Sequence, residues 1–220
     1  MATPRNQRIG IWIIAVVMVI GTLGSFAVIV LANQNSSGDQ ARMTELTNKY
    51  QEDTKAYQKK VDKQAKELSK KYFDEFNEYA DRPAKFDRDG VEKLKKEDLK
   101  EGDGKKLGKD ATFTAYYIGW TPDGKTFDSS IDGKELKAPF SVAPGGVIEG
   151  WTKGAEGMKV GGVRELTIPS DQAYGEKGSG DKIAPNTPLK FIIMVIPTPK
   201  EIPQPEMPEE LLKYYSNGMQ

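Results

Sequence analysis

An uncharged, apolar segment near the N-terminus constrains the fold of this chain more than any other feature. Residues 9–32 carry no charged side chain and consist mostly of Ile, Val, Leu, Ala, Phe, Trp and Met. As an α-helix with a rise of about 1.5 Å per residue, this segment would span about 36 Å, enough to cross the hydrocarbon core of a bilayer with some tilt. The sequence therefore predicts a transmembrane helix at 9–32, preceded by a short N-terminus of residues 1–8.

A cleaved secretory signal is the alternative interpretation of this segment. Arg5 and Arg8 form a basic start, and residues 30–32 resemble a cleavage site. The apolar part is longer than the roughly 7 to 15 residues usual in signal peptides, which favours an uncleaved anchor. Residues 33–40 contain no Lys or Arg, so the positive-inside rule predicts a single-pass protein of the cell membrane with its N-terminus in the cytoplasm and all later residues outside.

The next segment has the pattern of a long amphipathic helix. Residues 40–80 contain no Pro or Gly, and their larger apolar side chains recur at a mean spacing of about 3.6 residues. A strict 3.5-residue repeat would favour a long coiled coil, and this pattern departs from it, so we expect a helix that packs on something or weakly self-associates. We place a helical stalk and connector at 33–92. Three roles stay open for the stalk: a solvated spacer, a weak dimer contact through its Tyr/Leu stripe, and a surface that holds clients.

The composition of this 220-residue chain narrows the chemistry that it can perform. Basic and acidic side chains are equal at 32 each, so no overall charge attracts nucleic acid, and we expect no nucleic-acid partner. The chain has no Cys and no His, which excludes disulfides, thiol nucleophiles, Cys/His zinc sites and His-dependent triads. No acidic run has the spacing of a calcium loop. We expect no metal and no cofactor.

Four short strings in the second half of the chain concentrate aromatic side chains beside one carboxylate. They are YYIG at 116–119, GKTFDSS at 124–130, VIEGW at 147–151 and AYG at 173–175. Strand patterns occur at 111–118, 163–168 and 189–196, and residues 150–158 suit a short helix. Several strands with one short helix predict an α+β domain.

The order and spacing of these strings resemble those of the FKBP-type peptidyl-prolyl cis-trans isomerases over residues 93–197. The resemblance implies a twisted antiparallel β half-barrel wrapped around a short α-helix, with the site in the cleft between them. It also implies proline-containing polypeptides as clients and macrolides as inhibitors. Residues 198–220 form a Pro-rich C-terminal tail, in which 209–215 suit one or two helical turns.

The resemblance also assigns roles to individual side chains. Trp151 would form the floor of the pocket, between Phe127 and Phe191 as walls. The Ile148 N–H and the Tyr174 hydroxyl would donate to ligand carbonyls. Asp128 would accept a hydrogen bond from Tyr117 and polarise the pocket. The implied catalytic residues are Asp128, Tyr174, Tyr117 and Trp151, and the implied substrate-binding residues are Phe127, Phe140, Val147, Ile148, Ile183 and Phe191.

Taken singly, these residues have structural interpretations as well. Aromatic residues at strand positions, such as Phe127, Phe140 and Phe191, are more often core than site, and a lone Asp128 before two serines could cap a turn. The joint occurrence of the strings favours the pocket.

The chemistry implied by such a pocket needs no titrating group. Rotation about an X-Pro bond breaks no covalent bond, and its barrier of about 18–20 kcal/mol comes from amide resonance. The leading interpretation is thus an isomerase that acts on exported proteins. The alternatives are a non-catalytic chaperone or proline-peptide-binding module of the same fold, and a cell-surface protein whose stalk is the working part.

Overall fold

The structure is a computed structural model that describes residues 37–217. These divide into two compact units, Gln64–Lys200 and a second one that combines 37–63 with 201–217. The predicted membrane segment at 9–32 lies outside the described residues. Within 37–217, no helix combines the length and apolar character that crossing a membrane requires.

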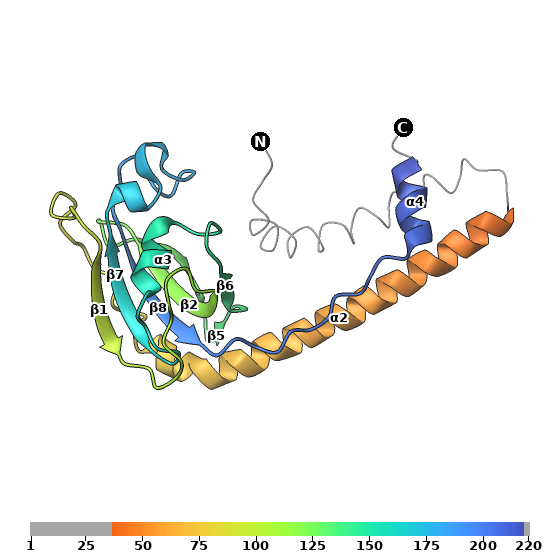
Figure 1. Ribbon diagram of the computed structural model, residues 1–220, viewed down its shortest axis with the longest axis horizontal. Helices are drawn as coiled ribbons and strands as arrows, with labels where there is room; N and C mark the ends of the chain where they lie inside the picture. The colour runs from red at the N-terminus through yellow and green to blue at the C-terminus, as the bar shows by residue number, and fades with distance from the viewer. Residues whose placement is uncertain (1–36, 218–220) are drawn as a thin grey trace. The chain divides into compact units, whose positions relative to one another are not determined.

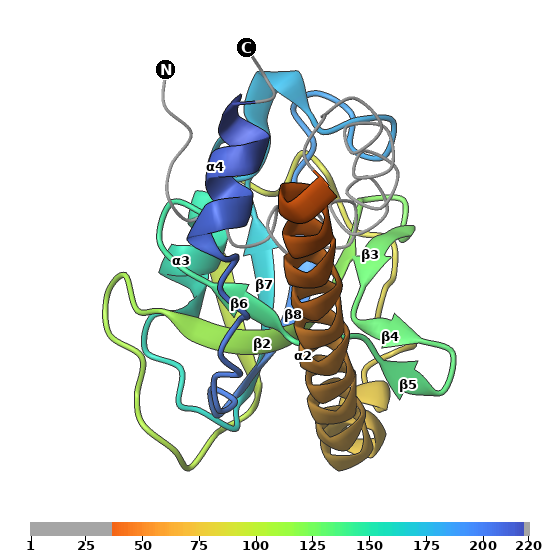
Figure 2. The same ribbon diagram turned by 90° about the vertical axis from the view of Figure 1, so that its right-hand side faces the viewer.

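An antiparallel sheet forms the centre of the first unit, with its strands in the order β1-β7-β8-β2-β3 and with β6 also paired to β2 (Figures 1 and 2). The strands are β1 (Lys95–Lys100), β2 (Phe113–Trp120), β3 (Thr126–Ser129), β6 (Phe140–Val142), β7 (Val163–Ile168) and β8 (Leu189–Ile196). A separate hairpin pairs β4 (Ile131–Asp132) with β5 (Glu135–Leu136). The predicted α+β class and the three predicted strands are confirmed.

The sheet buries apolar side chains on both of its faces. Because successive side chains of a strand point to opposite faces, β8 divides its residues between two clusters: Phe191 and Ile193 belong to one, whereas Ile192 and Met194 belong to the other. β8 pairs with β7 on one side and β2 on the other. A strand covered on both faces is expected to have a continuous apolar sequence, as β8 does.

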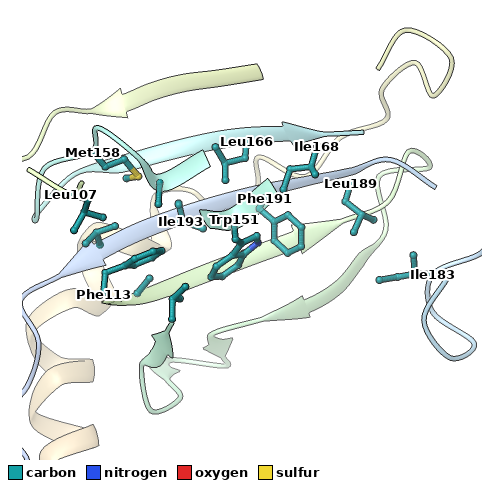
Figure 3. Close-up of a cluster of buried hydrophobic side chains, with 14 residues drawn as sticks. Leu107, Phe113, Trp151, Met158, Leu166, Ile168, Ile183, Leu189, Phe191 and Ile193 are labelled. Atoms are coloured by element: carbon teal, nitrogen blue, oxygen red, sulfur yellow. The ribbon is translucent and has the colours of Figure 1, made fainter. Parts of the chain in front are cut away.

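Helix α3 (Glu149–Ala155) covers the first face of the sheet (Figure 1). Gly150 and Gly154 lie four residues apart and therefore face the same side of the helix. A Cβ atom on Gly150 would come within 2.3 Å of Ile168 Cγ2, and one on Gly154 within 2.4 Å of Leu166 Cδ1. The helix backbone can approach β7 this closely only because both residues lack a side chain. Figure 3 shows Trp151 of this helix beside Phe191 of β8.

The other face of the sheet is covered by the last turns of helix α2 (Ser37–Asn77), within the unit Gln64–Lys200. The Phe76 side chain is fully buried, and the rings of Tyr72 and Phe76 both lie 6.1 Å from that of Tyr116. The Ser69 hydroxyl accepts a hydrogen bond of 2.7 Å from the Leu136 N–H. The sequence predicted a helix that packs on something, and at its C-terminal end the partner is the sheet.

Strand β1 is an element that the sequence pattern did not reveal. Its sequence, KKEDLK, carries five charged side chains and has no apolar alternation, so the strand patterns in the sequence did not include it. The strand lies at the edge of the sheet and pairs only with β7. Its exposed side chains face solvent, and lysines at a sheet edge discourage pairing with another chain.

The second unit contains the first part of α2 and the C-terminal helix α4 (Glu209–Asn217). Arg42 makes two hydrogen bonds to the carboxylate of Glu210, of 2.6 and 2.7 Å, and Leu211 is buried. The expected one or two helical turns near residue 209 are therefore present. The ion pair is exposed, so its contribution to stability is expected to be below about 1 kcal/mol.

Candidate active site

A cavity of about 160 Å³ opens at the first face of the sheet, beside α3. Its lining brings together residues that are far apart in the sequence: Tyr117, Phe127, Asp128, Phe140, Gly146, Val147, Ile148, Trp151, Tyr174 and Phe191. Of the residues that the sequence assigned to the site, only Ile183 is not part of this lining. Ile183 is buried in the core cluster that also contains Trp151, and it reaches the cluster from a loop (Figure 3).

Aromatic rings arranged edge to face form the floor and walls of the cavity. The ring of Trp151 lies 5.3 Å from that of Tyr117, 5.3 Å from that of Phe191 and 6.1 Å from that of Phe140, measured between centroids. Phe127 meets Phe191 at 5.5 Å and 86°. Such perpendicular arrangements are the favoured ones for aromatic pairs. Trp151 is only 4% exposed whereas Phe140 is 39% exposed, so the indole forms a buried floor below a more open rim.

Gly119 provides the space that two of these rings occupy. A Cβ atom at this position would lie 2.6 Å from Phe191 Cε1 and 2.7 Å from Phe127 Cζ. Neither ring could keep its place beside a larger residue. Gly119 therefore shapes the pocket wall without lining it, and a single sequence contains no signal for this role.

The carboxylate of the pocket is held by hydrogen bonds. The Tyr117 hydroxyl donates to Asp128 Oδ2 at 2.5 Å, and the Ser129 N–H donates to Asp128 Oδ1 at 2.8 Å. Burial, together with the hydrogen bond to Asp128, raises the pKa of Tyr117 above its ordinary value of 10.0. The Tyr117 hydroxyl therefore stays protonated at neutral pH and orients Asp128 from one side.

Two donors at the cavity have no hydrogen-bond acceptor among the described residues. They are the backbone N–H of Ile148, which directly precedes α3, and the hydroxyl of Tyr174. Burial, followed by the nearby charge of Asp128, raises the pKa of Tyr174, so its hydroxyl keeps its proton at neutral pH. Both groups can donate to a carbonyl that enters the cavity.

Two lysines that the sequence interpretation did not single out bind the strand beside the cavity. Lys137 Nζ donates to the Ser129 carbonyl at 2.8 Å and lies 3.9 Å from Asp128 Oδ1. Lys182 Nζ donates to the Phe127 carbonyl at 3.2 Å. Because the chain has many lysines, no pattern in the sequence distinguishes these two. Both lysines donate hydrogen bonds to backbone carbonyls of β3, the strand that contains Phe127 and Asp128.

The arrangement combines an apolar floor with a few fixed polar groups. Such a site can enclose a small apolar ring and bind the adjacent carbonyls, as ligand pockets commonly do. Its lining contains one carboxylate, which already accepts two hydrogen bonds, and no group poised as a nucleophile. The cavity is therefore suited to binding and conformational change of a ligand.

The second half of the chain is similar to known proteins. A family model described as FKBP-type peptidyl-prolyl cis-trans isomerase matches residues 104–196. An FK506-binding protein of Neisseria meningitidis serogroup A is 43% identical over 100 residues, which are 46% of this chain and 91% of that protein. One from Streptomyces anulatus is 43% identical over 97 residues, 43% of this chain and 77% of that protein. A solved peptidyl-prolyl cis-trans isomerase of Pseudomonas syringae aligns with a TM-score of 0.43 at 33% identity, covering 62% of this chain and 94% of that one.

Proposed function

The chain belongs to the FKBP-type peptidyl-prolyl cis-trans isomerase family, and we propose that its aromatic cavity rotates X-Pro bonds of exported proteins without covalent or metal chemistry. The observation that carries this proposal is the buried indole of Trp151 below two uncommitted donors, the Ile148 N–H and the Tyr174 hydroxyl. Proline-containing chains are the substrates of the family, and macrolides of the FK506 type are its ligands.

The mechanism follows from what an X-Pro amide loses when it twists. The planar amide has a charge-separated resonance form that water solvates better than the twisted amide. A pocket that excludes water therefore raises the free energy of the planar state more than that of the twisted one. In the proposed mode of binding, the proline ring lies on Trp151, and the donors at Ile148 and Tyr174 hold the neighbouring carbonyls. No proton is transferred.

The proposal predicts that two pocket substitutions reduce turnover by different routes. Asp128→Ala leaves the Tyr117 hydroxyl without its acceptor, and Tyr174→Phe removes a ligand donor. We expect kcat/KM to fall about tenfold for the first and about fivefold for the second, sizes typical of losing single hydrogen bonds. A protease-coupled assay with an X-Pro peptide on the full-length chain measures both.

A surface substitution distant from the cavity provides the control for this assay. Lys159 forms an exposed ion pair with Glu101, so Lys159→Ala should retain the wild-type kcat/KM. If the wild-type chain binds the peptide but the bond rotates at its uncatalysed rate, the protein is a non-catalytic binding module of the same fold.

The location of the domain forms a second part of the proposal. We propose that residues 9–32 anchor the chain in the cell membrane, with the isomerase domain on the extracytoplasmic side. Support comes from the length and apolar composition of this segment and from the basic residues Arg5 and Arg8 before it. Clients would then be proteins that have just crossed the membrane.

A fractionation experiment tests this location. The full-length chain should stay in the membrane pellet after an alkaline carbonate wash, and deleting residues 9–32 should move it to the supernatant. Protease added outside intact cells should digest the domain. A mature chain that begins near residue 33, identified by mass spectrometry, would instead establish a cleaved signal.

A further inference from the structure

A short segment upstream of the matched family domain docks along the turn between β2 and β3. The Trp120 Nε1–H donates to the Ala84 carbonyl at 3.1 Å, and the Phe86 N–H donates to the Pro122 carbonyl at 3.0 Å. A Cβ atom on Gly124 would lie 3.0 Å from the backbone nitrogen of Lys85. Residues 84–86 are therefore fixed against the sheet, although the family model begins only at residue 104.

Arg88 follows this fixed segment, and its side chain contacts the backbone of residues 185–186. Arg88 Nη2 donates to the Pro185 carbonyl at 3.2 Å and to the Asn186 carbonyl at 3.0 Å. Among the described residues, no carboxylate lies within ion-pair distance of Arg88. Within the described structure, the Arg88 guanidinium thus donates to two adjacent backbone carbonyls, which ties this side chain to the position of the loop backbone.

The two carbonyls belong to residues 185–186, which close the loop that begins at Tyr174. We call these two residues the neck of the loop. The Asn186 N–H donates to the Gly175 carbonyl at 2.8 Å and so closes the loop next to Tyr174. Asn186 has a φ of +54°, a left-handed conformation that Asn tolerates better than most residues. Arg88 therefore binds the neck at a residue whose backbone has a left-handed conformation.

The interior of the same loop is anchored in the core cluster on the pocket's side of the sheet. Ile183 pairs with Ser179 through two backbone hydrogen bonds, of 2.8 and 3.1 Å, and its side chain is buried in the cluster that contains Trp151 and Phe191. A shift of the neck would therefore move the Tyr174 hydroxyl at the rim of the cavity. Arg88 itself is not part of the cavity lining.

We propose that Arg88 is a positioning residue for the isomerase: by binding the Pro185 and Asn186 carbonyls, it holds the loop that presents Tyr174 to the substrate. This role rests on the proposed function of the cavity. It makes a segment outside the matched family domain part of the active-site scaffold. The same anchoring of residues 84–86 explains how an exposed side chain can hold a loop in a defined place.

Kinetics of the full-length chain test this role. Arg88→Ala should lower kcat/KM about fivefold, as expected when one hydrogen-bonded tether is lost. The change should come mainly from a higher KM, because the loop presents a binding donor. Arg88→Lys keeps a cationic donor and should recover most of the loss. The matched control is Lys85→Ala, which removes an exposed charge three residues away whose side chain forms no hydrogen bond or ion pair with the described residues.

A double-mutant cycle distinguishes positioning from a general loss of structure. If Arg88 acts through Tyr174, the effect of Arg88→Ala should shrink to less than about twofold in a Tyr174→Phe background. Amide exchange at the Asn186 N–H should also quicken in Arg88→Ala, with exchange in β7 and β8 unchanged.

The outcomes separate this role from the proposed function. If the wild type is active but Arg88→Ala has the same kcat/KM as Lys85→Ala, the role of Arg88 is overturned and the proposed function is not. The same holds if Arg88→Ala lowers kcat/KM by the same factor in the Tyr174→Phe background as in the wild type. A wild type that rotates the bond only at the uncatalysed rate overturns the proposed function and, with it, the role of Arg88.

Discussion

Replacing Trp151 by alanine should lower kcat/KM for X-Pro rotation about 100-fold, which corresponds to about 2.7 kcal/mol of transition-state stabilisation. The indole is the floor of the cavity and touches the rings of Tyr117, Phe140 and Phe191. Its removal opens the floor to water, and water restores the solvation that favours the planar amide. The protease-coupled assay measures this change.

The same substitution removes a buried side chain from the core, so stability must be measured beside activity. Trp151→Ala should cost about 3–5 kcal/mol in the free energy of unfolding. Trp151→Phe keeps most of the apolar volume and should cost less than about 1.5 kcal/mol, and it should still lose much of the activity because the smaller ring leaves a gap in the floor. The second variant therefore tests the pocket in a chain that folds.

Trp120 offers a matched control for Trp151. It is also a buried tryptophan, but it belongs to the cluster on the opposite face of the sheet and donates its indole N–H to Ala84. Trp120→Phe should lower stability and, because the Trp120 indole N–H anchors residues 84–86, should lower kcat/KM per folded molecule by no more than the roughly fivefold loss expected for Arg88→Ala. Equal losses of activity from Trp120→Phe and Trp151→Phe would contradict the assignment of Trp151 as the pocket floor.

Replacing Arg164 by alanine should destabilise the fold by about 3 kcal/mol, the scale of leaving a buried backbone carbonyl without its charged hydrogen-bond donor. Arg164 is a residue of β7 that is 6% exposed, and its side chain reaches the end of α3. Its Nη1 donates to the carbonyls of Gly154 and Glu156, at 2.7 and 3.1 Å. Nε and Nη2 donate to the two carboxylate oxygens of Asp98, at 2.6 and 3.0 Å.

One guanidinium thus joins α3, β7 and β1. The hydrogen bonds from Arg164 lower the pKa of Asp98 below its ordinary value of 3.8. Arg164→Lys should recover little of the lost stability, because an ammonium cannot reproduce the planar fork that binds Asp98 and the helix carbonyls together. Unfolding in urea, followed by tryptophan fluorescence, gives the free energies.

The exposed pair between Lys159 and Glu101 provides the comparison for Arg164. Its charged atoms lie 2.7 Å apart, yet both side chains are exposed to solvent. Lys159→Ala should therefore change stability by less than about 1 kcal/mol. A loss of similar size from Arg164→Ala would show that the buried guanidinium does not hold α3 to the sheet.

Local sequence patterns were sufficient for the elements whose side chains are buried regularly. β8 has an apolar run because both of its faces are covered, and β7 alternates. The pocket strings were recognisable because an aromatic cavity needs several rings together with one carboxylate, and few other folds place those residues in that order. β1 was not predicted because this solvated edge strand buries too few side chains to produce an apolar alternation in its sequence.

By itself, the sequence determined the family, the strand and helix types, and the aromatic residues that meet around Trp151. The residue types alone do not distinguish Trp120 from Trp151, and only the family resemblance singled out Trp151; in the fold, the pleat of the sheet and the placement of α3 put the two tryptophans on opposite faces. Nor could the sequence show that Gly119 and Gly154 leave room for side chains distant in sequence, or that Arg88 binds the neck of the Tyr174 loop. These features depend on distances between segments that meet only when the chain folds, whereas patterning reflects the burial of each segment alone.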